Sequence, residues 1–268
     1  MGSHEVLEKP PGMPAIPFPK KKVARDVAER ELQILEKAYP HAVTALEYRN
    51  PFELLIAVIL SAQCTDARVN MTTPALFAKY PDARALAKAK AEDVETIIKS
   101  CGFYHMKAKN IINASRDLVE KHGGDVPSER EELESLAGVG RKTASVVMSV
   151  VFAEAAFAVD THVFRVSHRL GLTTGTTPRA VEEDVTALVP REKWRFAHHW
   201  LILHGRTICK APTPLCGQCP VNEICPTPAI IAKMNRARAT TVTGPSGRGA
   251  KAVATRRPAR SASAKRKR

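Results

Sequence analysis

Long hydrophobic runs are missing from this chain of 268 residues, and aromatic residues make up only 5% of it. The longest apolar run, Leu54–Leu60, is far too short to cross a bilayer, which argues against a membrane-spanning protein. Residues 1–22 are rich in proline and lysine and lack the apolar core of a secretory signal. We therefore expect a cytoplasmic protein, whose hydrophobic content of 44% suffices for one sizeable core or two modest ones.

Acidic residues are absent from Lys233–Arg268, which holds twelve lysines and arginines. These account for most of the formal net charge of +14, so the residues before them are close to neutral. A segment of alanine, threonine, serine, proline, glycine and basic residues cannot bury enough apolar surface to fold alone. We predict a disordered tail over residues 229–268 that binds polyanions through their phosphates. The alternative is a solubilising tail with no specific role.

Strand patterns are also lacking, and apolar residues recur at helical spacing along most of the chain. Glycines at positions 102, 123 and 124 are typical of helix ends. The sequence predicts an all-α fold with disordered ends at residues 1–23 and 229–268. The expected helices cover Asp26–Tyr39, Pro51–Ala62, Asp66–Lys79, Leu86–Lys90, Ala91–Ser100, Met106–His122, Thr161–Leu170, Pro178–Val189 and Arg195–Gly205, and Ser128–Leu136 leads into a G-x-G turn.

Four of the six cysteines lie within seventeen residues in the spacing C-x6-C-x2-C-x5-C, as Cys209, Cys216, Cys219 and Cys225. Disulfides are not expected in a cytoplasmic chain. Four thiolates in so short a loop can converge on a tetrahedral metal ion or a cubane iron–sulfur cluster. Zinc sites usually show two C-x2-4-C pairs and this loop has one, which favours a [4Fe–4S] cluster and leaves zinc as the alternative.

The segment LAGVGRKTASVVM, Leu136–Met148, carries a lysine just inside a predicted helix start. The turn of Gly138, Val139 and Gly140 presents backbone N–H groups that can hold a phosphate. The positive end of the helix dipole disfavours another positive charge, which favours a neutral, nucleophilic amine at Lys142. The alternative is a tight connection followed by a solvated lysine. Further on, Asp160 directly precedes a predicted helix and is a good N-cap residue.

Several segments in order resemble the bacterial endonuclease III family of helix-hairpin-helix DNA glycosylases. They are NPFELLIAVILSAQCTDARVN, GFYHMKAKNI, LAGVGRKTASVV, VDTHVFRVSHRLGL, HHWLILHGRTIC and the four-cysteine loop, and together they run over about residues 26–226. The resemblance implies two helical domains with a DNA-binding cleft between them. A six-helix domain with the helix-hairpin-helix would span 44–154, and an iron–sulfur cluster domain would combine 24–43 with 155–228.

The resemblance also implies a bifunctional DNA glycosylase and abasic-site lyase that excises oxidised pyrimidines from duplex DNA. The family's catalytic lysine and aspartate fall on Lys142 and Asp160, and its cluster ligands fall on the four cysteines. The expected partner is double-stranded DNA with damaged pyrimidines or abasic sites. We expect a monomeric bacterial protein associated with the nucleoid.

Weaker expectations concern DNA contacts. Gln63 and Phe103 fall where the family wedges side chains into the gap left by a flipped base, although packing at helix ends is an equal alternative. The other expected contacts are Gly138, Val139 and Gly140 at a phosphate, and His162 and Arg165 on the helix after Asp160. Asp66 and Glu134 match acidic positions near the family's pocket, and solvation is the usual state of such side chains.

The sequence departs from the family pattern in two places. Ala137 stands where proline is usual, and the loop KAPTPL after Cys209 keeps a single basic residue, Lys210. We expect the basic tail to supply part of the missing phosphate binding. An adenine-specific glycosylase of the same superfamily is a rival, but such enzymes lack the lysine and carry an extra domain. A non-catalytic DNA-binding module is disfavoured by the joint presence of Lys142 and Asp160.

Overall fold

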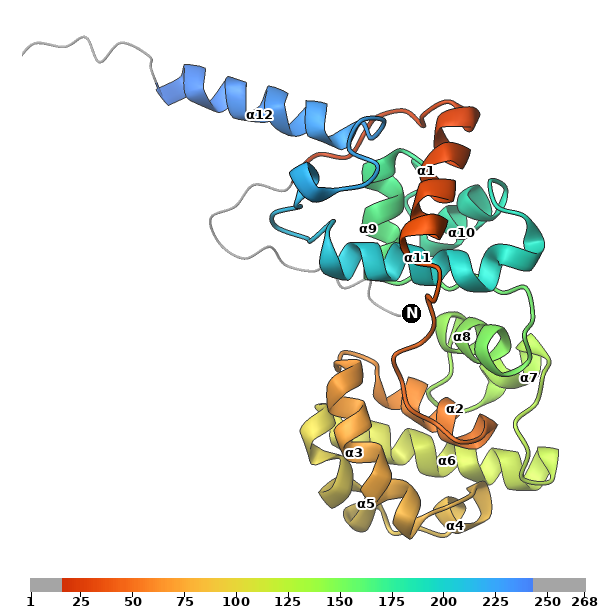
Figure 1. Cartoon of the computed structure of the whole chain (residues 1–268). Coiled ribbons are helices and arrows are strands. Elements are labelled where there is room, and N and C mark those ends of the chain that lie inside the picture. Colours follow the sequence, from red (N-terminus) through yellow and green to blue (C-terminus); the bar gives the residue numbers. More distant parts are fainter. Residues whose placement is uncertain (1–15, 243–268) are drawn as a thin grey trace, which may run out of the picture. The chain divides into compact units, whose positions relative to one another are not determined.

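The computed structural model describes residues 16–242, and every regular element in that range is helical (Figure 1). The prediction of an all-α fold is confirmed. The helices are α1 (Arg25–Ala38), α2 (Pro51–Leu60), α3 (Asp66–Lys79), α4 (Ala83–Ala87), α5 (Ala91–Ile98), α6 (Tyr104–His122), α7 (Arg130–Ser135), α8 (Arg141–Val151), α9 (Thr161–Leu170), α10 (Pro178–Thr186), α11 (Trp194–Thr207) and α12 (Thr227–Val242), with 3-10 turns η1 (Lys99–Cys101), η2 (Arg191–Lys193) and η3 (Cys216–Gln218).

Local sequence explains where many of these helices begin and end. Five of them start at a residue whose side chain accepts a hydrogen bond from a first-turn N–H, namely Asn50, Thr65, Asp82, Asp160 and Thr177. Helices α6 and α9 end at glycines with positive φ, Gly123 and Gly171, a conformation that costs glycine nothing. The helix boundaries therefore follow from short-range chemistry.

The first core is the hydrophobic cluster that runs from Leu46 to Val147 and draws on helices α2 to α8. Helix α2 lies at its centre, because every residue from Phe52 to Leu60 is buried. It contacts α3, α6 and α8. A helix that is apolar on all sides is stable only when other elements surround it, and the sequence predicted this placement.

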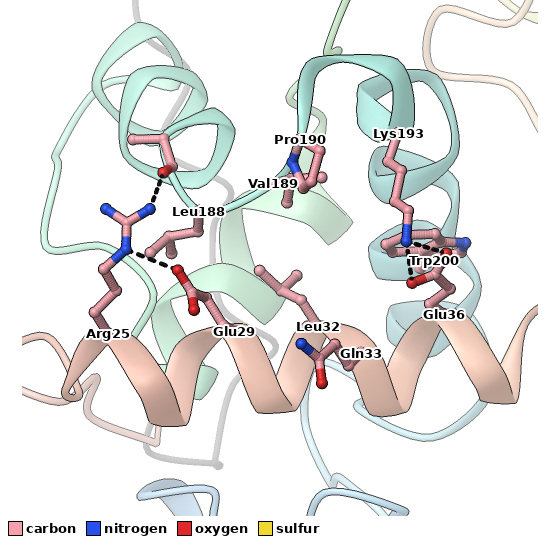
Figure 2. Close-up of a pocket in the computed structure, with 11 residues that line it drawn as sticks. Arg25, Glu29, Leu32, Gln33, Glu36, Leu188, Val189, Pro190, Lys193 and Trp200 are labelled. Carbon is pink, nitrogen blue, oxygen red and sulfur yellow. Dashed lines mark hydrogen bonds and ion pairs between the residues drawn. The ribbon is translucent and has the colours of Figure 1, made fainter.

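The second core is the cluster formed by Ala28–Ala42 and Phe157–Val221. Helix α1 precedes the whole first core in the chain, yet it packs against α11. Polar contacts hold the two walls of a cavity between α1 and the segment from α10 to α11 (Figure 2). The Arg25 guanidinium donates to the Ala187 carbonyl at 3.0 Å, and Lys193 forms an ion pair with Glu36 at 2.8 Å.

Residues 16–23 and 229–242, for which the sequence predicts disorder, are ordered in the structure. The segment before α1 is tied to the second core, because the Val23 N–H donates to the Gly171 carbonyl at 2.9 Å and Lys22 pairs with Asp184 at 2.5 Å. Residues 229–242 continue α12, whose alanine, methionine, lysine and arginine residues are good helix formers. Residues 1–15 and 243–268 lie outside the described residues.

The chain divides into one compact unit that ends at Ile231 and a second unit that begins at Ala232. Both cores and all the site residues discussed below belong to the first unit. No helix in the described range is long and apolar enough to cross a membrane.

Candidate functional site

Lys142 and Asp160 line the same pocket, although they belong to different helices. Lys142 lies in the first turn of α8 and is exposed, and Asp160 is the N-cap of α9. The Asp160 carboxylate accepts a hydrogen bond from the Val163 N–H at 2.8 Å, which confirms the N-cap prediction. The other walls come from the segment 43–46, α2, the start of α3, and α11. Two polar residues suited to proton and covalent chemistry therefore face one space.

The glycine turn before α8 has two distinct glycines. Gly138 has φ of +78°, and a Cβ there would lie 2.9 Å from the Asn110 side chain, so no other residue fits without strain. Gly140 has an ordinary φ of −104°, and a Cβ there would meet nothing within 4 Å. Its side of the turn is open to an approaching ligand.

The donors of this turn are only partly free. The Val139 N–H donates to the Leu136 carbonyl at 3.1 Å, and the Val139 side chain is buried. The first N–H groups of α8, like those of any helix, have no partners within the helix. Gly140 at the N-cap has no side chain that could accept from them. These helical N–H groups, rather than that of Val139, are the donors that a phosphate could reach.

Gln63 and Phe103 share an unusual backbone. They have φ of +51° and +47°, and among the described non-glycine residues only Ala153 also has positive φ. Both side chains are exposed, and that of Phe103 is 68% exposed. Such conformations are costly and are found disproportionately at functional sites. The packing alternative is therefore weaker for Phe103, whose ring is not buried by the helix end.

Arg165 and His162 are engaged within the protein. The Arg165 guanidinium donates to the carbonyls of Gly205 at 2.9 Å and Cys209 at 3.2 Å, and to Nδ1 of His162 at 3.1 Å. Burial lowers the pKa of both side chains. Arg165 thus joins α9 to the end of α11 and to the cysteine loop. These contacts give Arg165 a structural role that needs no DNA contact.

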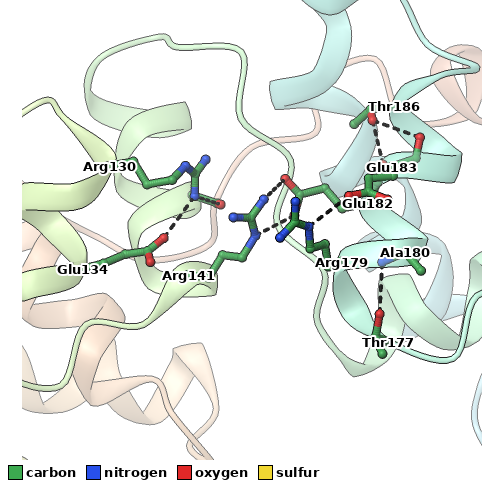
Figure 3. Close-up of polar contacts among 10 residues, drawn as sticks. Arg130, Glu134, Arg141, Thr177, Arg179, Ala180, Glu182, Glu183 and Thr186 are labelled. Atoms are coloured by element: carbon green, nitrogen blue, oxygen red, sulfur yellow. Dashed lines mark hydrogen bonds and ion pairs between the residues drawn. The ribbon is translucent and has the colours of Figure 1, made fainter.

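Ion pairs fix the elements around the pocket. Arg206 of α11 pairs with Asp66 of α3 at 2.8 Å, which gives Asp66 a structural partner. Figure 3 shows Arg141, the neighbour of Lys142, directed toward Glu182 of α10, with two hydrogen bonds of 3.1 Å. Glu134 is 3.5 Å from Arg130 in the same view. The contact of Arg141 with Glu182 holds the start of α8 against α10, that of Arg206 with Asp66 joins α11 to α3, and that of Arg130 with Glu134 lies within α7.

Sequence reasoning missed two histidines in this pocket, His198 and His199 on α11. Burial is the main cause that lowers the pKa of both, that of His199 to about 4. The signal available in the sequence was a pair of adjacent histidines inside an otherwise apolar helix.

The four cysteines of the loop line a second cavity, together with Arg169 and His204. Arg169 is buried and holds the loop through hydrogen bonds of 2.6 Å to the carbonyls of Lys210 and Ala211. Its Nη1 also donates to Cys209 Sγ at 3.6 Å, and its Nε has no partner among the described residues. A buried cation with a spare donor suits an anionic thiolate group in this cavity.

The thiols of the loop resist ionisation. Burial raises the pKa of Cys219 to about 11 and that of Cys225 to about 12, and the other cysteines of the loop add to both shifts. Thiolates at these positions therefore need a bound cation to be stable at neutral pH. No three histidine, cysteine or acidic side chains in residues 16–242 come close enough together to hold a single metal ion.

Comparison with known proteins agrees with this arrangement. The model of the HhH-GPD superfamily of base excision DNA repair proteins matches residues 56–191. Endonuclease III of Synechocystis sp. is 50% identical over 196 residues, which are 73% of this chain and 90% of the relative. Endonuclease III of Escherichia coli (strain K12) is 47% identical over 191 residues, or 71% and 90%.

Solved structures give the same result. A trapped covalent intermediate of an endonuclease III with DNA matches with a TM-score of 0.75 and 44% identity, over 79% of this chain and 99% of the other. A non-covalent endonuclease III–DNA complex matches with a TM-score of 0.76 and 43% identity, over 80% and 99%. The chain belongs to the HhH-GPD superfamily and, within it, to the endonuclease III family, and has its fold of two helical domains with a DNA cleft.

Proposed function

We propose that this protein excises oxidised pyrimidines from duplex DNA with Lys142 as its nucleophile. Membership of the endonuclease III family makes it a base excision repair enzyme, a DNA glycosylase with abasic-site lyase activity. The observation that carries the proposed chemistry is that Lys142 and Asp160 line one pocket. Because one chain supplies both residues, we propose that it acts as a monomer.

The proposed reaction begins when the damaged nucleotide leaves the base stack and enters the pocket. Once the Lys142 amine has lost its proton, it forms a bond to C1′ of the sugar while the bond from C1′ to the base breaks, and the base leaves. Opening of the sugar ring gives an iminium between Lys142 and C1′. The iminium acidifies the C2′ proton, and its loss expels the 3′ phosphate by β-elimination.

Asp160 supports this reaction from the start of α9. Its carboxylate stabilises positive charge on the sugar or helps to deprotonate Lys142, and these two roles stay open. The same carboxylate caps α9, so its position does not depend on substrate.

The proposed DNA interface surrounds the pocket. The open side of Gly140 and the first N–H groups of α8 hold a phosphate beside the lesion, which carries no base information. Gln63 and Phe103 fill the gap that the flipped base leaves, in agreement with their exposure and positive φ. The basic tail adds phosphate contacts, and each one lost should flatten the slope of log K against log salt by about 0.9. A chain that ends at Val242 and keeps the full slope would contradict that role.

We propose that Cys209, Cys216, Cys219 and Cys225 hold a [4Fe–4S] cluster. Zinc and a cubane cluster both accept four cysteine ligands, and the loop has one C-x2-C pair where zinc sites usually have two, which favours the cubane. When bound, the cluster supplies cross-links, and four cysteine ligands leave no open position for substrate. Its proposed role is structural: it positions the domain of residues 24–43 and 155–228 on DNA, next to the six-helix domain, 44–154.

Borohydride trapping on an oligonucleotide with an abasic site or an oxidised thymine tests the mechanism. Wild type should form a covalent adduct, and Lys142→Ala should form none. Lys88→Ala, which changes an exposed lysine on the first core, is the matched control and should trap normally. Asp160→Asn keeps an N-cap acceptor but loses the charge, and we expect trapping to slow by about 100-fold. Lesion-specific excision that persists undiminished in Lys142→Ala would instead indicate a monofunctional glycosylase.

The cofactor has a separate test. Anaerobically purified protein should be brown, with a broad visible absorption and about four irons per chain. A colourless protein with one zinc per chain would establish the alternative.

A further inference from the structure

His198 is a buried histidine in the pocket to which the proposed chemistry assigns no role. It lies on α11 and has no exposed surface. Its ring packs against His199, with centroids 3.9 Å apart, and against the edge of Phe157 at 6.1 Å. It lines the pocket together with Lys142, and the two side chains interact electrostatically.

The two ring nitrogens of His198 differ in their surroundings. Nδ1 lies 3.4 Å from the Trp194 carbonyl, which can only accept a hydrogen bond, so Nδ1 carries the proton. Nε2 then bears a lone pair, and it has no partner among the described residues. Buried polar atoms are almost always hydrogen-bonded, so an unpaired acceptor in a pocket that Lys142 also lines needs an explanation.

Burial also keeps this ring neutral, because it lowers the pKa of His198 well below the usual value. A neutral imidazole beside Lys142 adds no positive charge to the pocket. The titratable and charged groups that face the same pocket are Asp66 on α3, Lys142 on α8, Asp160 at the start of α9, and His199 and Arg206 on α11.

His198 and Lys142 are not hydrogen-bonded in this structure, and the Lys142 side chain is exposed. We propose that His198 is a positioning residue: in the complex with DNA, Lys142 turns toward it, and its Nε2 accepts a hydrogen bond from the Lys142 amine and directs the amine's lone pair toward C1′ of the flipped nucleotide. The proposal rests on Lys142 being the nucleophile. No proton is transferred to His198. A nucleophile held in the attacking orientation reacts faster than one on a freely rotating side chain, because less orientational freedom is lost at the transition state.

A pair of substitutions separates the two ring nitrogens. His198→Gln can place an acceptor near the position of Nε2, whereas His198→Asn reaches only the position of Nδ1. In single-turnover trapping at an abasic site, His198→Gln should react within about 3-fold of wild type and His198→Asn at least about 10-fold more slowly. DNA affinity and thermal midpoint, measured in parallel, should be the same in both variants.

The pH profile of trapping distinguishes orientation from protonation. If His198 orients the amine, the deficit of His198→Asn persists at alkaline pH, where the amine is neutral in both proteins. A deficit that vanishes at alkaline pH would overturn the orienting role. Equal rates in the two variants, whether slow or like wild type, would overturn it too. Normal trapping by His198→Asn beside no trapping by Lys142→Ala would reject this inference and leave the proposed function standing.

A measurement on folded wild type avoids any folding defect of these variants. In protein with 15N-labelled histidine bound to DNA that carries an unreactive abasic-site analogue, Nε2 of His198 should resonate as an unprotonated nitrogen that accepts a hydrogen bond. In Lys142→Ala, this resonance should move toward that of a free acceptor. A protonated Nε2, or a resonance unchanged by Lys142→Ala, would refute the contact.

Discussion

The two cores of this protein differ in how completely they satisfy their own buried polar groups. In the region of the first core, Lys107 is buried but donates to the carbonyls of Leu60 at 2.9 Å and Cys101 at 2.7 Å. Glu53 is buried and accepts from Arg49 at 2.6 Å. In the region of the second core, four residues have buried side-chain atoms without a partner among the described residues, namely Glu31, Ser167, Arg169 and His198. In the region of the first core, Ser149 on α8 is the one such residue among those described.

This difference indicates what each region is for. Among the described residues, helices α2 to α8 leave one buried side-chain atom without a partner, the hydroxyl of Ser149. The region of α1 and α9 to α11 keeps unpaired buried groups near the four cysteines and near Lys142. Unpaired buried groups are costly, and they are retained where another molecule or group completes the site. The unpaired groups of the second region thus lie near the proposed sites, and they lower the stability of that region.

The largest expected effect comes from the cysteines. Cys219→Ser removes a proposed cluster ligand, and loss of a structural metal group can remove on the order of 10 kcal/mol of folding free energy. Both tryptophans of the chain, Trp194 and Trp200, lie on α11, so their fluorescence reports on the second core. We expect red-shifted tryptophan emission while much of the helical circular dichroism remains. Unchanged emission would show that the second core holds without the cluster.

A cavity in the first core should have a smaller effect. Leu54→Ala removes a fully buried side chain from α2, which should lower the free energy of unfolding by about 2–5 kcal/mol. Urea unfolding followed by circular dichroism and by tryptophan fluorescence measures both regions. Coincident shifts of both transitions would show that the two cores unfold together, and a shift seen by circular dichroism alone would show that they are independent.

The two glycines of the turn before α8 provide a matched pair. Gly138→Ala should destabilise the protein by about 1–3 kcal/mol, because a Cβ at positive φ also meets the Asn110 side chain. Gly140→Ala should leave stability nearly unchanged and weaken DNA binding, since its Cβ would stand on the open side of the turn. Thermal unfolding and DNA titration separate the two. The opposite ranking of stabilities would contradict the assigned roles.

The smallest expected effect is a pH dependence in the second core. Burial raises the pKa of Glu31 to about 9 from its usual 4.5, so the folded state keeps a proton that the unfolded state has lost. Stability from this group is therefore full below pH 4.5 and declines as the pH rises toward 9. The slope is at most about 1.4 kcal/mol per pH unit. Glu31→Gln should weaken the pH dependence of the urea midpoint between pH 7 and 8. An unchanged pH dependence would show that other groups cause it.

The elements of the fold could be predicted because short-range rules decide them. Apolar spacing located most helices, and Asp160 and Gly123 marked a beginning and an end through capping chemistry. The end of α12 was missed, since a basic composition reads as disorder even where alanines and long side chains support a helix. The engagement of Arg165 was missed as well, because its partners are carbonyls some 40 residues away.

By itself, the sequence determined the helical class, the burial of α2, the four-cysteine loop and the family to which the chain belongs. These follow from periodicity and from the order of local motifs, which do not depend on distant contacts. Only the tertiary structure decided that Lys142 and Asp160 line one pocket with His198 and His199, and that α1 belongs to the second core. The packing of helices that are far apart in the chain decides which side chains meet, and this packing cannot be predicted from local spacing.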